Sequence, residues 1–330
     1  MMIIVRAPLR ITLGGGGTDL PGWYTQHGGF LISAAINKYI YLSGSSRNFD
    51  KKIWLSYSKV EICNSVDEIS HEIASKVLTK YNLKNGIEIH SISEVSGGSG
   101  LGSSGTFTVG LYHLLNTMFK KDMTRHQLAE AAAYTEMIEL GKHCGKQDQF
   151  IASYGGIKAL HFNTKGEVVV KAIELDQTTL ITLKNNLHIY HTGVSRDANL
   201  VLNDQNTKLK NKQKSPSEGM KRIQEIGYQA QEYLLSGSLE AFGESLNEHW
   251  KVKKSISNKM SSPEIDDLYD LAIRSGALGG KVMGAGGGGY FMFYVPAEKH
   301  LSFRKEMQKN GLFEMNWEFD LNGANTIFTG

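Results

Sequence analysis

The chain has 330 residues, of which 41% are hydrophobic, with 36 Lys and Arg against 33 Asp and Glu. A net charge of +3 is too small to indicate a nucleic-acid partner, and no apolar run approaches the ~20 residues of a membrane span. Two cysteines, Cys63 and Cys144, without CxxC spacing argue against a disulfide scaffold or a structural zinc site. We therefore expect a cytoplasmic protein that binds neither nucleic acid nor membrane.

The first half of the chain mixes strand and helix patterns. Helical spacing predicts a helix over 67–81, one beginning near Ser103, and one opened by the capping box of Thr124 and Gln127. Alternating apolar residues predict strands over 3–13, 30–44, 52–57, 86–95, 158–162 and 167–173.

The second half has the same mixed character. Two helices are expected to begin at 215–218 and 262–263, each with a proline in its first turn. A further helix is expected over 296–310. Short strands are expected over 187–190, 280–283, 290–295 and 313–321. This pattern predicts an α+β fold with two domains, residues 1–180 and 181–330.

Glycine is unusually frequent, at 36 residues, and much of it falls in three clusters: 14–17, 97–105 and 284–289. Glycine is useful where backbone must approach a ligand closely. We therefore expect three loops that meet at one site.

The second cluster joins a predicted strand to a predicted helix, which makes it a candidate phosphate site. It lacks the lysine of a Walker A loop, and the chain has no HRD, DFG or GxSxG motif. A GxGxxG pattern does occur at Gly100, Gly102 and Gly105, but a second helix follows where a dinucleotide-binding unit needs a strand. An NAD(P)-binding oxidoreductase is therefore only a remote alternative.

Four motifs in the chain resemble those of the GHMP kinase superfamily of small-molecule kinases. They are Ala7–Arg10 leading to the 14–19 glycine segment, Ser99–Ser104, Gly145–Gln149 and Lys281–Gly289. The opening GGGGTDLP, the GKQDQ segment and residues 191–197 are similar to the bacterial sugar branch, which includes heptose 7-phosphate and fucose kinases. Gly105 departs from the usual pattern, in which Ala or Ser follows the phosphate loop.

The resemblance implies a ribosomal-S5-like N-terminal domain and a ferredoxin-like C-terminal domain, with the active site in the cleft between them. It implies ATP and Mg²⁺ as cofactors and phosphorylation of a sugar at its anomeric hydroxyl. The implied substrate is D-glycero-D-manno-heptose 7-phosphate, and a fucose- or galactose-type sugar 1-kinase is the alternative. A non-catalytic binding module is disfavoured because the matching catalytic positions are all retained.

The resemblance also assigns residues. Asp148 corresponds to the catalytic aspartate, as a base or as a group that orients the hydroxyl, and Arg10 to the N-terminal cation. Ser104 and Glu136 correspond to the metal ligands, with Glu139, one turn on, as the other candidate. The ATP phosphates are assigned to Gly97, Gly98, Ser99, Gly100, Leu101, Gly102, Ser103 and Ser104. Substrate binding is assigned to Thr18, Asp19, Gly193, Arg196, Gly286 and Gly287, with Arg196 suited to holding a substrate phosphate.

Overall fold

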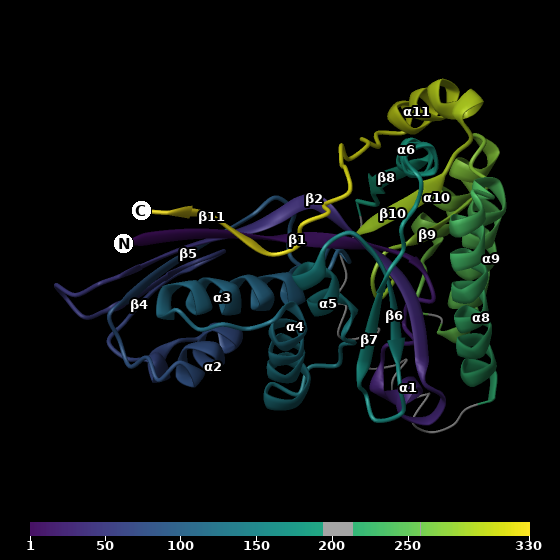
Figure 1. The fold of residues 1–330 in the computed structure, drawn as a ribbon. Coiled ribbons are helices and arrows are strands. Elements are labelled where there is room, and N and C mark those ends of the chain that lie inside the picture. The colour runs from purple at the N-terminus through teal and green to yellow at the C-terminus, as the bar shows by residue number, and fades with distance from the viewer. Residues whose placement is uncertain (194–213, 258) are drawn as a thin grey trace.

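Two long strands, β1 (Met2–Gly14) and β2 (Gly29–Ser46), form the frame of the molecule in a computed structural model that describes residues 1–193, 214–257 and 259–330. They pair antiparallel over nearly their whole length and cross the structure from end to end (Figure 1). The register shifts between Pro8 and Leu9, since proline has no N–H to donate to the ladder.

The first sheet has eight strands in its described part, and β1 and β2 lie at its centre. The order is β11-β1-β2-β5-β3-β4, and β6 and β7 extend the sheet from another part of β2. All pairings are antiparallel except that between β3 and β5. The remaining strands are β3 (Ile53–Ser56), β4 (Val60–Cys63), β5 (Ile87–Ser93), β6 (Ile157–Phe162), β7 (Val168–Ala172) and β11 (Asn325–Thr329).

Helices from the first half of the chain cover this sheet. The apolar helix α3 (Ser103–Phe119) and the short α5 (Gln147–Tyr154) pack against β1 and β2, so their N-terminal turns are held rigidly at the sheet. Also present are α1 (Pro21–His27), a 3₁₀ turn (Val66–Glu68), α2 (Glu72–Lys80) and α4 (Arg125–Tyr134), which continues into a π-helical turn (Thr135–Glu139). The capping box predicted at Thr124 and Gln127 is confirmed.

A second, three-stranded antiparallel sheet has the order β8-β10-β9. Its core contains the fully buried Trp250, Phe291 and Phe293. The strands are β8 (Leu187–His191), β9 (Gly279–Val282) and β10 (Tyr290–Tyr294). The helices of this half are α6 (Gln177–Asn186), α8 (Lys214–Ser236), α9 (Leu239–Ile256), α10 (Pro263–Arg274) and α11 (His300–Lys309), which follows a 3₁₀ turn (Ala297–Lys299).

The two sheets are joined by the helical pair α8 and α9 (Figure 1). Helix α8 packs on β1 and β2, whereas α9 packs on β9 and on α8. The predicted α+β, two-domain architecture is confirmed. Among the described residues, no helix is both long enough and apolar enough to cross a membrane.

The predicted strand over 313–321 is wrong. This stretch makes only single bridges, from Glu314 to Tyr190 and from Phe319 to Ile36. It crosses from the second sheet to the first and therefore cannot pair continuously with either. The chain then forms β11 beside β1, which brings the two termini together (Figure 1).

Candidate active site

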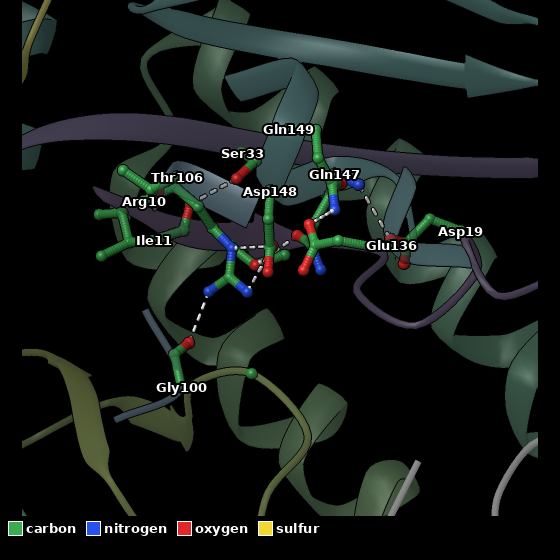
Figure 2. A network of polar contacts seen from close by, with 12 residues as sticks. Arg10, Ile11, Asp19, Ser33, Gly100, Thr106, Glu136, Gln147, Asp148 and Gln149 are labelled. Atoms are coloured by element: carbon green, nitrogen blue, oxygen red, sulfur yellow. Dashed lines mark hydrogen bonds and ion pairs between the residues drawn. The ribbon is translucent and has the colours of Figure 1, made fainter. Parts of the chain in front are cut away.

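An ion pair between Arg10 on β1 and Asp148 on α5 lies at the centre of the candidate site (Figure 2). The Nε and Nη2 atoms of Arg10 are each 2.7 Å from Oδ1 of Asp148. The third guanidinium nitrogen, Nη1, donates to the carbonyl oxygen of Gly100 at 2.6 Å. One buried side chain thus connects the first strand, the predicted catalytic aspartate and the predicted phosphate loop.

Asp148 occupies the first turn of α5, but it does not cap the helix. The N-cap position is Lys146, and no side chain caps it. The carboxylate of Asp148 is 25% exposed, whereas the side chain of Arg10 is 4% exposed. Asp148 is therefore open to the cleft on one side and held by Arg10 on the other.

The predicted phosphate loop ends at an uncapped helix N-terminus. Gly102 is the N-cap residue of α3 with a φ of 85°, and no side chain bonds to the first-turn N–H groups. The hydroxyl groups of Ser99 and Ser103 are buried without a hydrogen-bond partner. Unpaired donors at the positive end of a helix dipole fit an anion such as a phosphate. Helix α3 is followed by α4 and not by a strand, so the GxGxxG pattern does not lie in a dinucleotide-binding unit.

Ser104 and Glu136 lie together beside this loop. The hydroxyl of Ser104 donates to Oε1 of Glu136, and Nε2 of Gln149 donates to Oε2 at 2.7 Å. Burial raises the pKa of Glu136. The π-helical turn that contains Glu136 widens the end of α4, and such turns are frequent at functional sites. Glu139, the other candidate ligand, is paired with Lys80 at 2.7 Å.

The Ser104–Glu136 pair suits Mg²⁺ better than a metal that needs many protein ligands. Among the described residues there is no cluster of three or more His, Cys, Asp or Glu side chains that would hold a metal ion. Mg²⁺ typically takes one or two protein oxygens and completes its shell with phosphates and water. A hydroxyl and a carboxylate next to a phosphate-binding loop therefore fit that ion.

A cavity of about 620 Å³ adjoins the phosphate loop. Its walls include Tyr57, His71 and Phe107, while Gly97, Gly98 and Ser104 lie at one end. A Cβ atom at Gly97 or Gly98 would meet no atom within 4 Å, so this part of the loop lies open. The volume is in the range of small-molecule and cofactor sites.

A smaller, more polar cavity has the Arg10–Asp148 pair in its wall. Gly16, Asp19, Lys253 and Gly284 belong to its walls. Asp19 is 2% exposed and accepts a hydrogen bond from the backbone N–H of Gln147 at 3.1 Å. Burial, with a smaller effect from Asp148, raises the pKa of Asp19 to about 6. Arg10 therefore links the two cavities, because it lines the small one and donates to Gly100 in the loop that borders the large one.

The three glycine clusters meet here, as expected. A Cβ atom at Gly100 would lie 2.6 Å from the carbonyl oxygen of Met283, and one at Gly284 would lie 2.7 Å from Cα of Gly100. Gly16 and Gly17, from the first cluster, line the small cavity together with Gly284. Backbone packs directly on backbone, which only glycine permits at these positions.

Some predicted substrate residues lie differently from what the sequence suggested. The Thr18 hydroxyl donates to the carbonyl oxygens of Gly15 and Phe30 and accepts a hydrogen bond from the N–H of Phe30. It therefore holds the loop in place and does not face the cavity. Gly286 and Gly287 pack against Met260.

The predicted substrate residues after β8 are placed only in part. Thr192, next to Gly193, donates its N–H to Gly289 at 2.8 Å, so this segment borders the third glycine cluster. The N–H of Gly193 itself bonds the ring of His191. Arg196 lies outside the described residues.

Sequence reasoning missed several residues that build the site. Gln147 accepts a hydrogen bond from Thr12 at 2.7 Å, and Gln149 orients Glu136. Both glutamines flank Asp148 in the sequence. Side chains two residues apart on a strand lie on the same face, so the sequence could have placed Thr12 beside Arg10. Lys253 had no such signal, because its helix approaches the site only through the tertiary fold.

Two regions of the chain match known domain families. Residues 68–156 match the family described as GHMP kinases N terminal domain, and residues 230–311 match GHMP kinases C terminal. A D-glycero-alpha-D-manno-heptose 7-phosphate kinase from Campylobacter jejuni subsp. jejuni serotype O:2 is 27% identical over 333 residues, which cover 98% of each chain.

Solved structures show the same fold. A D-glycero-D-manno-heptose 1-phosphate kinase from Bacteriodes thetaiotaomicron matches with a TM-score of 0.82 and 23% identity over the whole of both chains. Lactococcus lactis galactokinase complexed with galactose matches with a TM-score of 0.76 and 20% identity, covering 98% of this chain and 94% of that one.

We predict that Asp19→Asn stabilises the fold at neutral pH. The carboxyl pKa is about 6 when folded against 3.8 for the unperturbed group, so the folded state holds this proton more tightly. The stability from this group is therefore present below pH 4 and is lost as the pH rises through 6. A shift of this size corresponds to about 3 kcal/mol at pH 8.

Urea unfolding of wild type and Asp19→Asn between pH 4.5 and 8 measures this effect. The gain in the free energy of unfolding should be largest at pH 8 and shrink steadily toward pH 4.5. Asp122→Asn, a change at an exposed loop aspartate, is the matched control and should show no such trend. A gain that is independent of pH would mean that the carboxyl charge of Asp19 is not its source.

Proposed function

The chain belongs to the GHMP kinases, and from this premise we propose that it is an ATP-dependent kinase that phosphorylates the anomeric hydroxyl of D-glycero-D-manno-heptose 7-phosphate, giving the 1,7-bisphosphate. The observation that carries the reaction type is the Arg10–Asp148 pair, which lines the small polar cavity and is linked through Gly100 to the loop that borders the larger cavity. The similarity to the Campylobacter heptose 7-phosphate kinase along nearly the whole chain supports this substrate over others.

The proposed roles follow from where the side chains lie. The loop 97–104 binds the ATP phosphates through the N-terminal N–H groups of α3 and the hydroxyls of Ser99 and Ser103. The sugar lies in the small cavity, with its hydroxyls bonded to Asp19. A buried carboxylate discriminates between sugars well, because a wrong epimer leaves it unpaired.

In the transfer step, the anomeric oxygen attacks the γ-phosphorus and the bond to the ADP oxygen breaks. Asp148 accepts the hydroxyl proton, and Arg10 holds that carboxylate in position through its two 2.7 Å contacts. Arg10 also donates a hydrogen bond to Gly100 in the loop, so the distance between the base and the phosphate site is fixed. Ser104 and Glu136 would hold Mg²⁺, which would neutralise phosphate charge when bound.

Arg196 is proposed to hold the 7-phosphate of the substrate. In the sequence it follows β8 and Thr192, whose N–H contacts the third glycine cluster. A guanidinium group binds phosphate through two parallel hydrogen bonds.

The use of ATP and the two free cysteines support a cytoplasmic location.

The proposed substrate is tested by a coupled ADP-release assay with Mg-ATP. The panel comprises D-glycero-D-manno-heptose 7-phosphate, the free heptose, fucose, galactose, mannose and mevalonate. We expect the heptose 7-phosphate to have the highest kcat/KM, about tenfold or more above the free heptose, because charge-assisted hydrogen bonds to its phosphate are lost in the latter. A preference for fucose or galactose would replace the proposed substrate with the sugar 1-kinase alternative.

We predict that Asp148→Asn lowers kcat by about two orders of magnitude or more, the usual scale for a lost acid–base group. Its KM for ATP should change little, because the phosphate loop does not depend on the carboxylate charge. Asp122→Asn is the matched control, at an exposed position. Near-normal turnover of folded Asp148→Asn, checked by circular dichroism, would remove Asp148 from the proposed chemistry.

We predict that Gly102→Ala impairs turnover as well as ATP binding. A Cβ atom at Gly102 would lie 3.0 Å from Cγ of Asp148, so the new methyl group displaces the catalytic carboxylate. We expect kcat to fall about tenfold or more, a change on the scale that small misplacements of reacting groups produce.

The control for Gly102→Ala is Gly311→Ala. Gly311 has a similar φ of 77°, but no atom would lie within 4 Å of its Cβ. Both variants carry the strain of a side chain at positive φ, but only Gly102→Ala adds a contact with Asp148. Equal kcat in the two variants would show that contact with Asp148 is not the cause of the loss.

A further inference from the structure

A buried lysine from the second half of the chain faces the small cavity. Lys253 on α9 is 8% exposed and lines this cavity together with Arg10, Asp19, Asp148 and Gly284. Its Nζ donates to the carbonyl oxygen of Gly284 at 2.6 Å. Within the described residues, no carboxylate lies at ion-pair distance from it, whereas its half-buried neighbour Lys254 pairs with Asp266 at 2.8 Å.

A second buried lysine lies near Lys253. Lys281 on β9 is 3% exposed, and its Nζ lies 3.4 Å from Nδ1 of His249. Burial, together with repulsion from Lys253 and Arg10, lowers the pKa of Lys281. Arg10 has Asp148 as an ion-pair partner, but among the described residues neither lysine has a carboxylate at ion-pair distance, and Asp19 acts on Lys253 only at longer range. A buried ammonium group normally needs a partner of opposite sign, so the part of the cavity beside Lys253 is suited to an anion.

The position of Lys253 indicates which anion belongs there. Its hydrogen-bond partner Gly284 packs against Gly100, and Gly100 accepts a hydrogen bond from Arg10. Lys253 therefore lies where the phosphate loop, the third glycine cluster and the Arg10–Asp148 pair meet. A substrate phosphate far from the reacting hydroxyl would lie away from this junction. Burial and the charge of Arg10 lower the pKa of Lys253 to about 8, which leaves it mainly cationic at pH 7.

We propose that Lys253 binds the phosphoryl group on the sugar side of the cleft, both during transfer and in the sugar 1-phosphate product. The inference rests on the proposed function and adds a residue to it. Lys253 remains protonated throughout: the phosphorus–oxygen bond to ADP breaks, the bond to the sugar oxygen forms, and the hydroxyl proton goes to Asp148. The lysine contributes hydrogen bonds and charge that the unphosphorylated hydroxyl does not use.

The test compares Lys253→Met and Lys253→Arg with wild type. Titration calorimetry without ATP measures the binding of the sugar substrate and of its 1-phosphorylated product, and steady-state kinetics gives kcat and both KM values. In Lys253→Met we expect product affinity and kcat each to fall about tenfold or more, since charge-assisted bonds to the phosphoryl group are lost. Substrate affinity and the KM for ATP should stay near the wild-type values.

The controls separate charge from shape. Lys253→Arg keeps the positive charge and should retain most of the product affinity, whereas Lys254→Met removes a neighbouring charge outside the cavity and should behave like wild type. If thermal unfolding shows that Lys253→Met is not folded, Lys253→Gln takes its place, with the same expected loss.

Unchanged product affinity in folded Lys253→Met would overturn the proposal. An equal loss of affinity for substrate and product would also overturn it, because Lys253 would then bind the sugar itself or maintain the shape of the cavity. Either result leaves the proposed function intact as long as wild type phosphorylates the sugar. A wild type that is inactive on every sugar of the panel would overturn both.

Discussion

The structure of the site depends on the guanidinium group of Arg10. Its three nitrogens contact the carboxylate of Asp148 and the carbonyl of Gly100, and its backbone N–H bonds the carbonyl of Leu101. The position of β1 is itself fixed by its pairing with β2 along nearly the whole strand. The sheet therefore sets the distance between the proposed base, Asp148, and the proposed phosphate loop, two groups that lie about 50 residues apart in sequence. An arginine suits this role because its planar fork stays charged and directs several donors at once.

Close backbone packing adds a second constraint. Gly100 and Gly284 contact each other through their backbones, and Gly102 and Gly105 leave room for the side chain of Asp148. A Cβ atom at Gly105 would lie 2.7 Å from Cβ of Asp148. Glycine at position 105 therefore suits the packing of this chain, in which the start of α3 lies against α5. The glycine that weakens the helix start also lets these two helix ends approach.

Motifs and periodicity predicted much of this arrangement, because local chemistry specifies it. The loop 97–104, the capping box at Thr124 and the strands with alternating residues all follow from short-range patterns. The wrong strand over 313–321 has an alternating pattern, but its course between two sheets is a tertiary property. The same holds for Thr18, whose hydroxyl is used by backbone groups from 12 residues away. Lys253 reaches the site only because α9 packs on β9 and α8, which no local pattern of charges reveals.

Several charged groups in the cleft are held in environments that disfavour their charged forms. Burial raises the pKa of Asp19 and Glu136 and lowers that of Lys253 and Lys281. Each such group reduces the stability of the empty protein, so the fold alone does not account for their presence together. Three of these groups face different parts of the proposed ternary complex: sugar hydroxyls for Asp19, a metal for Glu136 and the phosphoryl group for Lys253. Under that proposal the ligands supply each of the three with a favourable partner, so the strain of the empty site becomes selectivity for the ligands that relieve it.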